Sequence, residues 1–142
     1  LAVKKAKGKY FLRVDSDDYL NKLTAQIMSE ILDNNKELSF VYSDHFRVDE
    51  KSIKQNLVRL KSLENLYLHG AGIMFRRKDI LSVGNYDKNL RGAEDHELIM
   101  RLIKNNKKSF HIPLPLYRYY IHNQNLTKSQ KRKNYIKRFS KF

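Results

Sequence analysis

Blocks of apolar and polar residues alternate along the chain and predict strands and helices in turn. Runs rich in aromatic and β-branched residues predict strands, whereas apolar residues spaced three and four positions apart predict amphipathic helices. Strands are expected at residues 10–14, 38–48, 69–77 and 109–122. Helices are expected at residues 19–34, 77–84 and 93–105, and a connection with one short helix at residues 49–66.

Strands that alternate with helices are typical of an α/β fold, here with a mostly parallel sheet flanked by helices. Pro113 and Pro115 favour an edge position or an irregular path for the last strand. The residues from Lys128 onward form a basic tail that is expected to be helical or disordered. The sequence therefore predicts one domain at residues 1–127 and a tail at residues 128–142.

Length and composition limit the kinds of protein this can be. A chain of 142 residues has the size of one domain, and 41% hydrophobic residues exclude a wholly disordered chain. Cysteine is absent, which excludes disulfides and thiolate metal sites. No run approaches the roughly 18–20 apolar residues that a membrane-spanning helix needs. The chain begins at Leu1, inside what resembles the end of a helix, so we expect further sequence upstream.

The net charge of +14 is concentrated at the two ends of the chain. Residues 1–14 carry five basic side chains and no acidic one, and residues 98–142 carry twelve and none. Basic ends of this kind indicate an anionic partner, such as a nucleotide phosphate, a nucleic acid or an acidic lipid surface. Charge alone does not choose among these three partners.

Three carboxylates, Asp15, Asp17 and Asp18, follow directly after the first predicted strand. Ligands collect at the carboxyl ends of strands in parallel α/β sheets. Carboxylates this close repel one another, and a divalent cation is one physical remedy. The alternative is an ordinary turn, in which Asp18 caps the following helix. Taken alone, this motif favours the turn.

A second acidic pair, Glu94 and Asp95, lies in the first turn of the helix predicted at residues 93–105. Carboxylates stabilise that position through the helix dipole, which is the simpler interpretation. The same dipole keeps a carboxylate ionised and able to accept a proton. His122 ends an aromatic segment just before a polar loop, where its side chain could reach a site. Taken alone, a single histidine is more often a packing or surface residue.

Aromatic residues are interleaved with basic ones near the end of the chain. Such a pattern could stack nucleic-acid bases and bind phosphates, but a sheet edge followed by a solvated tail explains it more simply. We favour the second interpretation and expect no nucleic-acid partner. The residues concerned are Tyr117, Tyr119, Tyr120, Tyr135 and Phe139.

The order of four segments, more than any one of them, is specific. They read "AKGKYFLRVDSDDYL", "GAGIMFRRKDILSVGNYD", "GAEDHELIMRL" and "IPLPLYRYYIHNQNLT". Together they closely resemble family 2 glycosyltransferases with the GT-A fold, over residues 6–127. The resemblance implies a partial GT-A, Rossmann-like fold, because the family's opening βαβ units, which bind the nucleotide base, have no counterpart in this sequence.

The resemblance also implies a donor site built on the acidic cluster. In the family a divalent metal, Mg²⁺ or Mn²⁺, binds at an Asp-x-Asp motif and holds the diphosphate of a nucleotide sugar. Carried over, Asp17 is the direct ligand, Asp15 lies nearer the ribose or the waters of the metal, and Asp18 belongs to the same donor-binding group. His122 matches a position that completes the metal or diphosphate site in many members.

The same resemblance implies an inverting reaction. Asp95 matches the catalytic base of the family and Glu94 its neighbour on the acceptor side. The Gln-x-x-Arg-Trp motif of processive members is absent, which implies addition of one sugar at a time. The implied partners are a nucleotide-sugar donor, UDP-linked by expectation, and a saccharide or lipid-linked acceptor of cell-envelope polysaccharide synthesis. A homo-oligomer is compatible with this assignment.

Two other functions remain open at this point. The chain could be a non-catalytic remnant or partner subunit of a glycosyltransferase, or, less favoured, a basic nucleic-acid-binding protein. The absence of cysteine fits a reducing compartment, and we expect a cytoplasmic protein whose basic tail rests on anionic lipid at the inner face of the membrane.

Overall fold

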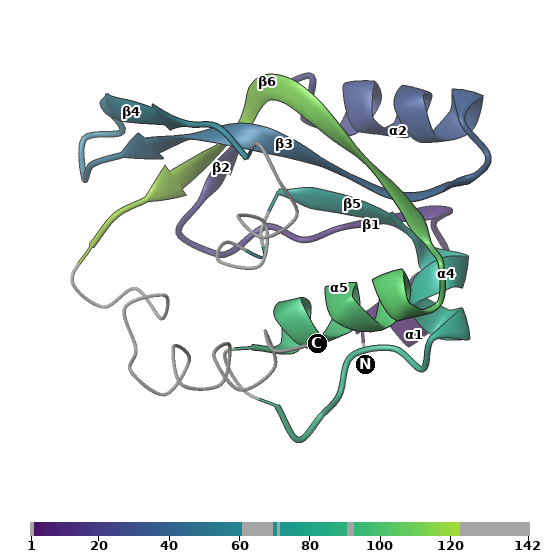
Figure 1. The fold of residues 1–142 in the computed structure, drawn as a ribbon. Coiled ribbons are helices and arrows are strands. Elements are labelled where there is room, and N and C mark those ends of the chain that lie inside the picture. Colours follow the sequence, from purple (N-terminus) through teal and green to yellow (C-terminus); the bar gives the residue numbers. More distant parts are fainter. Residues whose placement is uncertain (1, 61–69, 71, 91–92, 123–142) are drawn as a thin grey trace.

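The computed structural model describes residues 2–60, 70, 72–90 and 93–122 (Figure 1). In these ranges the chain folds into one sheet with helices on both of its faces. The strands are β1 (Tyr10–Leu12), β2 (Tyr19–Leu20), β3 (Leu38–Val48), β4 (Lys54–Val58), β5 (Ile73–Arg76) and β6 (Lys108–Tyr120). The helices are α1 (Ala2–Lys5), α2 (Thr24–Asn34), α4 (Arg77–Ser82) and α5 (Glu94–Lys104).

The sheet is mixed, so the expectation of a mostly parallel sheet is wrong, although the α/β class is confirmed. Its order is β1-β5-β3-β6-β2, with β4 paired to β3. Only the central pair β3–β6 is parallel, and the four other pairings are antiparallel. One reason is the tight turn between β3 and β4. A connection that short can join only antiparallel strands, because a parallel pair needs a crossover connection.

Two stretches that looked helical in the sequence contain strands instead. In the segment predicted as a helix at residues 19–34, β2 comes first and α2 begins only at Thr24. Tyr19 and Leu20 lie opposite Arg118 and Tyr117 of β6, so pairing with a distant strand overrides the local helical spacing. In the stretch at 49–66, β4 takes the place of a helix up to Val58. Residues 61–66 and the tail at 128–142 lie outside the described residues.

The prolines of β6 lie where the strand is irregular, as expected. The pairing of β3 with β6 shifts register on both sides of Asp44, which lies opposite Pro115. Although β6 lies between β3 and β2, β2 pairs only with Tyr117 and Arg118. The stretch that holds the prolines is therefore bonded on one side only, which is compatible with residues that lack an N–H donor.

The side chains of β1, β3 and β5 alternate between two apolar layers. Phe40 and Tyr42 of β3 point to the layer beneath α4 and α5, whereas Val41 between them points to the layer beneath α2. In β5, Phe75 and Met74 divide in the same way. Figure 1 shows α2 on one side of the sheet and α1, α4 and α5 on the other. The alternation thus determines which side chains of the sheet face α5, whose first turn carries Glu94 and Asp95.

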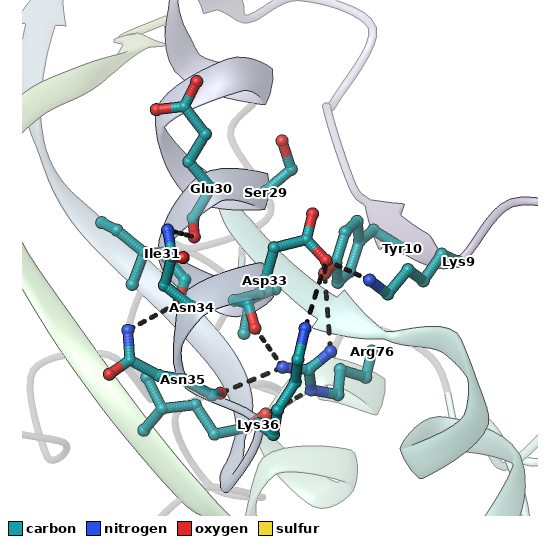
Figure 2. Close-up of polar contacts among 12 residues, drawn as sticks. Lys9, Tyr10, Ser29, Glu30, Ile31, Asp33, Asn34, Asn35, Lys36 and Arg76 are labelled. Carbon is teal, nitrogen blue, oxygen red and sulfur yellow. Dashed lines mark hydrogen bonds and ion pairs between the residues drawn. The ribbon is translucent and has the colours of Figure 1, made fainter.

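A buried arginine joins α2 to the sheet (Figure 2). Arg76, only 4% exposed, ends β5, and its guanidinium donates to the carbonyls of Leu32 and Asn35 at the end of α2. It also donates to the carbonyl of Leu38 at 2.6 Å. The last carbonyls of a helix have no partner within the helix, so Arg76 satisfies groups that would otherwise be buried without hydrogen bonds.

We predict that Arg76→Met lowers the free energy of unfolding by about 2–4 kcal/mol, because methionine fills the space but leaves these carbonyls unsatisfied. Urea denaturation followed by circular dichroism measures the change. The matched control is Arg47→Met on the exposed face of β3, which should change stability by less than about 0.5 kcal/mol. Equal effects of the two substitutions would contradict the role assigned to Arg76.

Candidate functional site

The acidic cluster forms a turn between β1 and β2. The N–H of Asp18 donates to the carbonyl of Asp15 at 3.1 Å, which closes the turn over Ser16 and Asp17. The expectation of a turn is therefore confirmed. The expectation that Asp18 caps the following helix is wrong, because α2 begins at Thr24 without a side-chain cap. The three carboxylates of one turn instead point to three different partners.

Asp18 is buried and anchors the turn to β6. The hydroxyl of Tyr117 donates to Oδ2 of Asp18 at 2.5 Å, and the N–H of Tyr120 donates to Oδ1 at 2.9 Å. Burial raises the pKa of Asp18 to about 6, although both hydrogen bonds act in the opposite direction. Burial and the contact with Asp18 raise the pKa of Tyr117 as well. The turn is thus bound to a strand that lies about a hundred residues later in the chain.

Asp17 lies against His122, two residues beyond the end of β6. Its Oδ2 is 2.8 Å from Nε2 of His122, whose ring stacks on Tyr120 with 5.1 Å between ring centres. The structure thus brings together two of the three side chains predicted to bind metal. Oδ1 of the third, Asp15, contacts Arg13. Over the described ranges, no three acidic, histidine or cysteine side chains converge closely enough to hold a metal ion, and the metal site stays a prediction.

Arg13 connects the turn to the N-terminus of α5. Its Nε and Nη2 each lie 3.1 Å from Oδ1 of Asp15, while Nη1 donates to Oδ2 of Asp95 and lies 3.6 Å from Oε1 of Glu94. Phe11 packs in the layer beneath α5, and residues of one strand face the same side at every second position. The side chain of Arg13 therefore lies on the same side of the sheet as that of Phe11, the side that faces α5.

Glu94 and Asp95 occupy the first turn of α5, as predicted. Arg13 contacts one oxygen of each carboxylate. The other oxygens, Oδ1 of Asp95 and Oε2 of Glu94, are buried and have no hydrogen-bond partner in the described part of the chain. A buried carboxylate oxygen without a donor is costly, and such sites are often completed by a ligand or water.

Gly70 makes room for Asp95. Its φ of +69° lies in the left-handed region, and a Cβ there would lie 2.8 Å from Oδ2 of Asp95. Gly72 has the same φ, and a Cβ at that position would lie 2.9 Å from the ring of Tyr117. Both glycines therefore allow the backbone before β5 to pass close to site residues.

Three residues of the site were not predicted from the sequence: Arg13, Tyr117 and Gly70. A signal for Arg13 was present, because a charged residue on the inward face of an apolar strand needs a buried partner. The small residues at positions 70–72 of the sequence are a signal for a close approach of the backbone to a bulky group, but they do not show that this group includes Asp95. Nothing local marked Tyr117, whose partner Asp18 lies on another element.

The other histidines of the described residues differ from His122 in their surroundings. His45 and His96 are buried in the domain, and burial lowers the pKa of His45 to about 4. His111 contacts Asp44 at 2.7 Å, away from the acidic turn along β6. Tyr117 is fully buried and cannot stack on a nucleic-acid base. His69, Tyr135 and Phe139 lie outside the described residues.

An open hollow of about 520 Å³ adjoins His122. It lies between the end of β6 and the turn that joins β3 to β4. Its lining combines charged side chains of the turn with the ring of Tyr120 and with isoleucine side chains. The lining residues are Asp49, Glu50, Lys51, Ile53, Tyr120, Ile121 and His122.

Comparison with known proteins finds a similarity that covers nearly the whole chain. Over an alignment of 151 positions, gaps included, which covers 99% of the chain, the chain is 27% identical to a protein of Methanocaldococcus jannaschii named as an uncharacterized glycosyltransferase. The aligned region is 49% of that relative, so the chain spans about half of the relative's length. No family model matches the sequence. Within the described residues, none of the helices is long and apolar enough to cross a membrane.

The raised pKa of Asp18 predicts a pH-dependent stability. Between the ordinary value of 3.8 and about 6 the folded protein holds more protons at Asp18 than the unfolded chain does. The free energy of unfolding of the wild type, relative to Asp18→Asn, should therefore fall as pH rises from about 4 to about 6 and then level off. Urea denaturation in the presence of a chelator measures this difference. Parallel curves for the two proteins would contradict the burial of an ionisable Asp18.

Proposed function

We propose that this chain is the catalytic part of a glycosyltransferase of family 2, with a partial GT-A fold. The observation that carries the proposal is the convergence of three distant segments. The acidic turn, the first turn of α5 and the end of β6 meet through Arg13 and through the pair of Asp17 and His122. These are the segments that carry the family's metal, base and diphosphate motifs, and the similarity to a protein named as a glycosyltransferase agrees with them.

The donor atoms at the turn fit a hard divalent cation. Asp17 and His122 offer a carboxylate oxygen and an imidazole nitrogen 2.8 Å apart, on the surface side of the buried Asp18. Mg²⁺ and Mn²⁺ commonly take one or two protein ligands and complete their shell with water and phosphate oxygens. The bound cation would neutralise charge on the departing nucleoside diphosphate. Asp15, Asp17 and Asp18 would belong to the donor side of the site.

The acceptor side lies at α5. Asp95 has its Oδ2 held by Arg13 and its Oδ1 buried without a partner from the described residues. Oδ1 would take the proton of an acceptor hydroxyl, whose oxygen attacks the anomeric carbon of the sugar as the bond to the diphosphate breaks. One displacement of this kind inverts the anomeric configuration. Glu94 would bind the acceptor beside it.

The proposed partners follow from this arrangement. The donor is a nucleotide sugar, with UDP as the first candidate, and the acceptor is a saccharide or a lipid-linked saccharide. The hollow of about 520 Å³ beside His122 is large enough for a sugar group of either substrate. The proposed location is the cytoplasmic face of a membrane, where the basic residues 128–142 would contact anionic lipid.

Two substitutions should separate donor binding from chemistry. Asp17→Asn should abolish the stabilisation by Mn²⁺ with UDP, because it removes the carboxylate that contacts the cation. Asp95→Asn should leave that stabilisation intact and lower sugar transfer by about 10²–10⁴-fold, the usual contribution of a general base. Differential scanning fluorimetry measures binding, and release of nucleoside diphosphate from UDP-sugars measures turnover.

Glu97→Gln is the matched control on α5. Glu97 lies on the same helix but forms its ion pair with Arg101 and not with Arg13. Its substitution should leave both the stabilisation by Mn²⁺ with UDP and the rate of sugar transfer close to wild type. If neither Mn²⁺ nor any of a panel of nucleoside diphosphates stabilised the wild type, the proposal would fail in favour of a non-catalytic remnant or subunit. Salt-sensitive binding of single-stranded nucleic acid that Asp17→Asn leaves unchanged would favour the nucleic-acid alternative.

A further inference from the structure

Arg13 forms ion pairs both with the acidic turn and with the first turn of α5. Among the described residues, it is the one lysine or arginine whose side chain does so. It uses two edges of the guanidinium for this. Nε and Nη2 contact Asp15, and Nη1 contacts Asp95 and approaches Glu94. A planar guanidinium presents donors in fixed directions, so one side chain can fix the relative positions of two carboxylates. Its side chain is 28% exposed and that of Asp95 is 10% exposed, which limits competition from water.

The contact selects one oxygen of Asp95 and leaves the other without a partner. Arg13 donates to Oδ2, and the missing side chain of Gly70 leaves space beside that same oxygen. Oδ1 has no hydrogen-bond partner from the described residues although it is buried. When one oxygen of a carboxylate is held in place, the lone pairs of the other oxygen also point in a defined direction. A general base needs such a defined direction, because it must lie within hydrogen-bond distance of the proton that it accepts.

We propose that Arg13 is a positioning residue for the transfer reaction, and that it links the donor-binding turn to the catalytic base. This inference rests on the proposed function. In it, Asp15 anchors the guanidinium, the guanidinium fixes Oδ2 of Asp95, and Oδ1 is the atom that receives the acceptor proton. Arg13 itself touches neither the proton nor the sugar. The donor-binding turn and the base are joined in this way because both contact the same side chain.

Lysine cannot replace arginine in this role. Its ammonium is a single point on a flexible stem, and it cannot present separate edges to Asp15 and Asp95. Arg13→Lys therefore keeps the charge of the site while losing the bridge. Arg13→Gln loses both, and Arg13→Ala leaves space into which a guanidinium ion from solution can bind.

The test compares these three variants with the wild type by steady-state sugar transfer and by the affinity for UDP in the presence of Mn²⁺. We expect kcat to fall about 10²-fold in Arg13→Lys and Arg13→Gln, the scale of a misplaced catalytic group, with the UDP dissociation constant within about threefold of wild type. Added guanidinium should restore part of kcat in Arg13→Ala but not in Arg13→Gln, whose side chain occupies the space. Arg47→Gln on the exposed face of β3 is the control and should keep wild-type kcat.

Three results would overturn the proposal. The first is wild-type kcat in Arg13→Gln. The second is full activity of Arg13→Lys, which would mean that charge alone suffices. The third is an equal loss of kcat and of UDP affinity without rescue by guanidinium, which would assign Arg13 to binding or to folding. A wild type that binds no nucleoside diphosphate and transfers no sugar would instead refute the proposed function, so the two failures are distinguishable.

Discussion

The site depends on one buried carboxylate, Asp18. It accepts hydrogen bonds from the hydroxyl of Tyr117 and the N–H of Tyr120, and so fixes the turn after β1 to the carboxyl end of β6. Without this anchor, an exposed turn that carries three negative charges would have little reason to stay against the sheet, because like charges repel. The burial of Asp18 raises its pKa to about 6, which means that its ionised form is less stable in the folded protein than in the unfolded chain. Holding the turn in place with an ionised Asp18 therefore lowers the free energy of unfolding.

The position of the anchor determines what the other carboxylates can contact. Tyr117 pairs with His45 of β3 in the central parallel ladder, which places the end of β6 beside the end of β3. Asp17 then lies against His122, two residues beyond β6, and Asp15 is left facing Arg13. Arg13 carries the connection on to α5. Asp18 is therefore a structural group, whereas its neighbours Asp15 and Asp17 point to other parts of the chain. Residues 15–18 can thus form an ordinary turn and a binding site at the same time.

Features set by local sequence could be predicted, and features set by distant partners could not. The strand at residues 38–48 has the predicted bounds because its aromatic and β-branched run is long and ends in charged residues. The carboxylates of α5 were placed correctly because the first turn of a helix favours them.

By contrast, Tyr19 and Leu20 continue the spacing of a helix, and only pairing with β6 makes them a strand. The mixed sheet escaped prediction for the same reason, since strand direction is decided by contacts between segments far apart in sequence. The contact of Asp95 with Arg13 spans 82 positions and has no local signature. The segments of the site could thus be found from the sequence, while the side chains that connect them required the structure.

The most direct test of this account is paramagnetic broadening of histidine resonances by Mn²⁺ in the presence of UDP. His111 lies near the start of β6 and His122 just beyond its end, about 35 Å apart along the chain at the rise of a strand, and of the two only His122 contacts Asp17. Substoichiometric Mn²⁺ should broaden the imidazole signal of His122 strongly and leave that of His111 sharp, and Asp17→Asn should remove the difference. Equal broadening of both signals, or selective broadening of His111, would contradict a cation site at the junction of the acidic turn and β6.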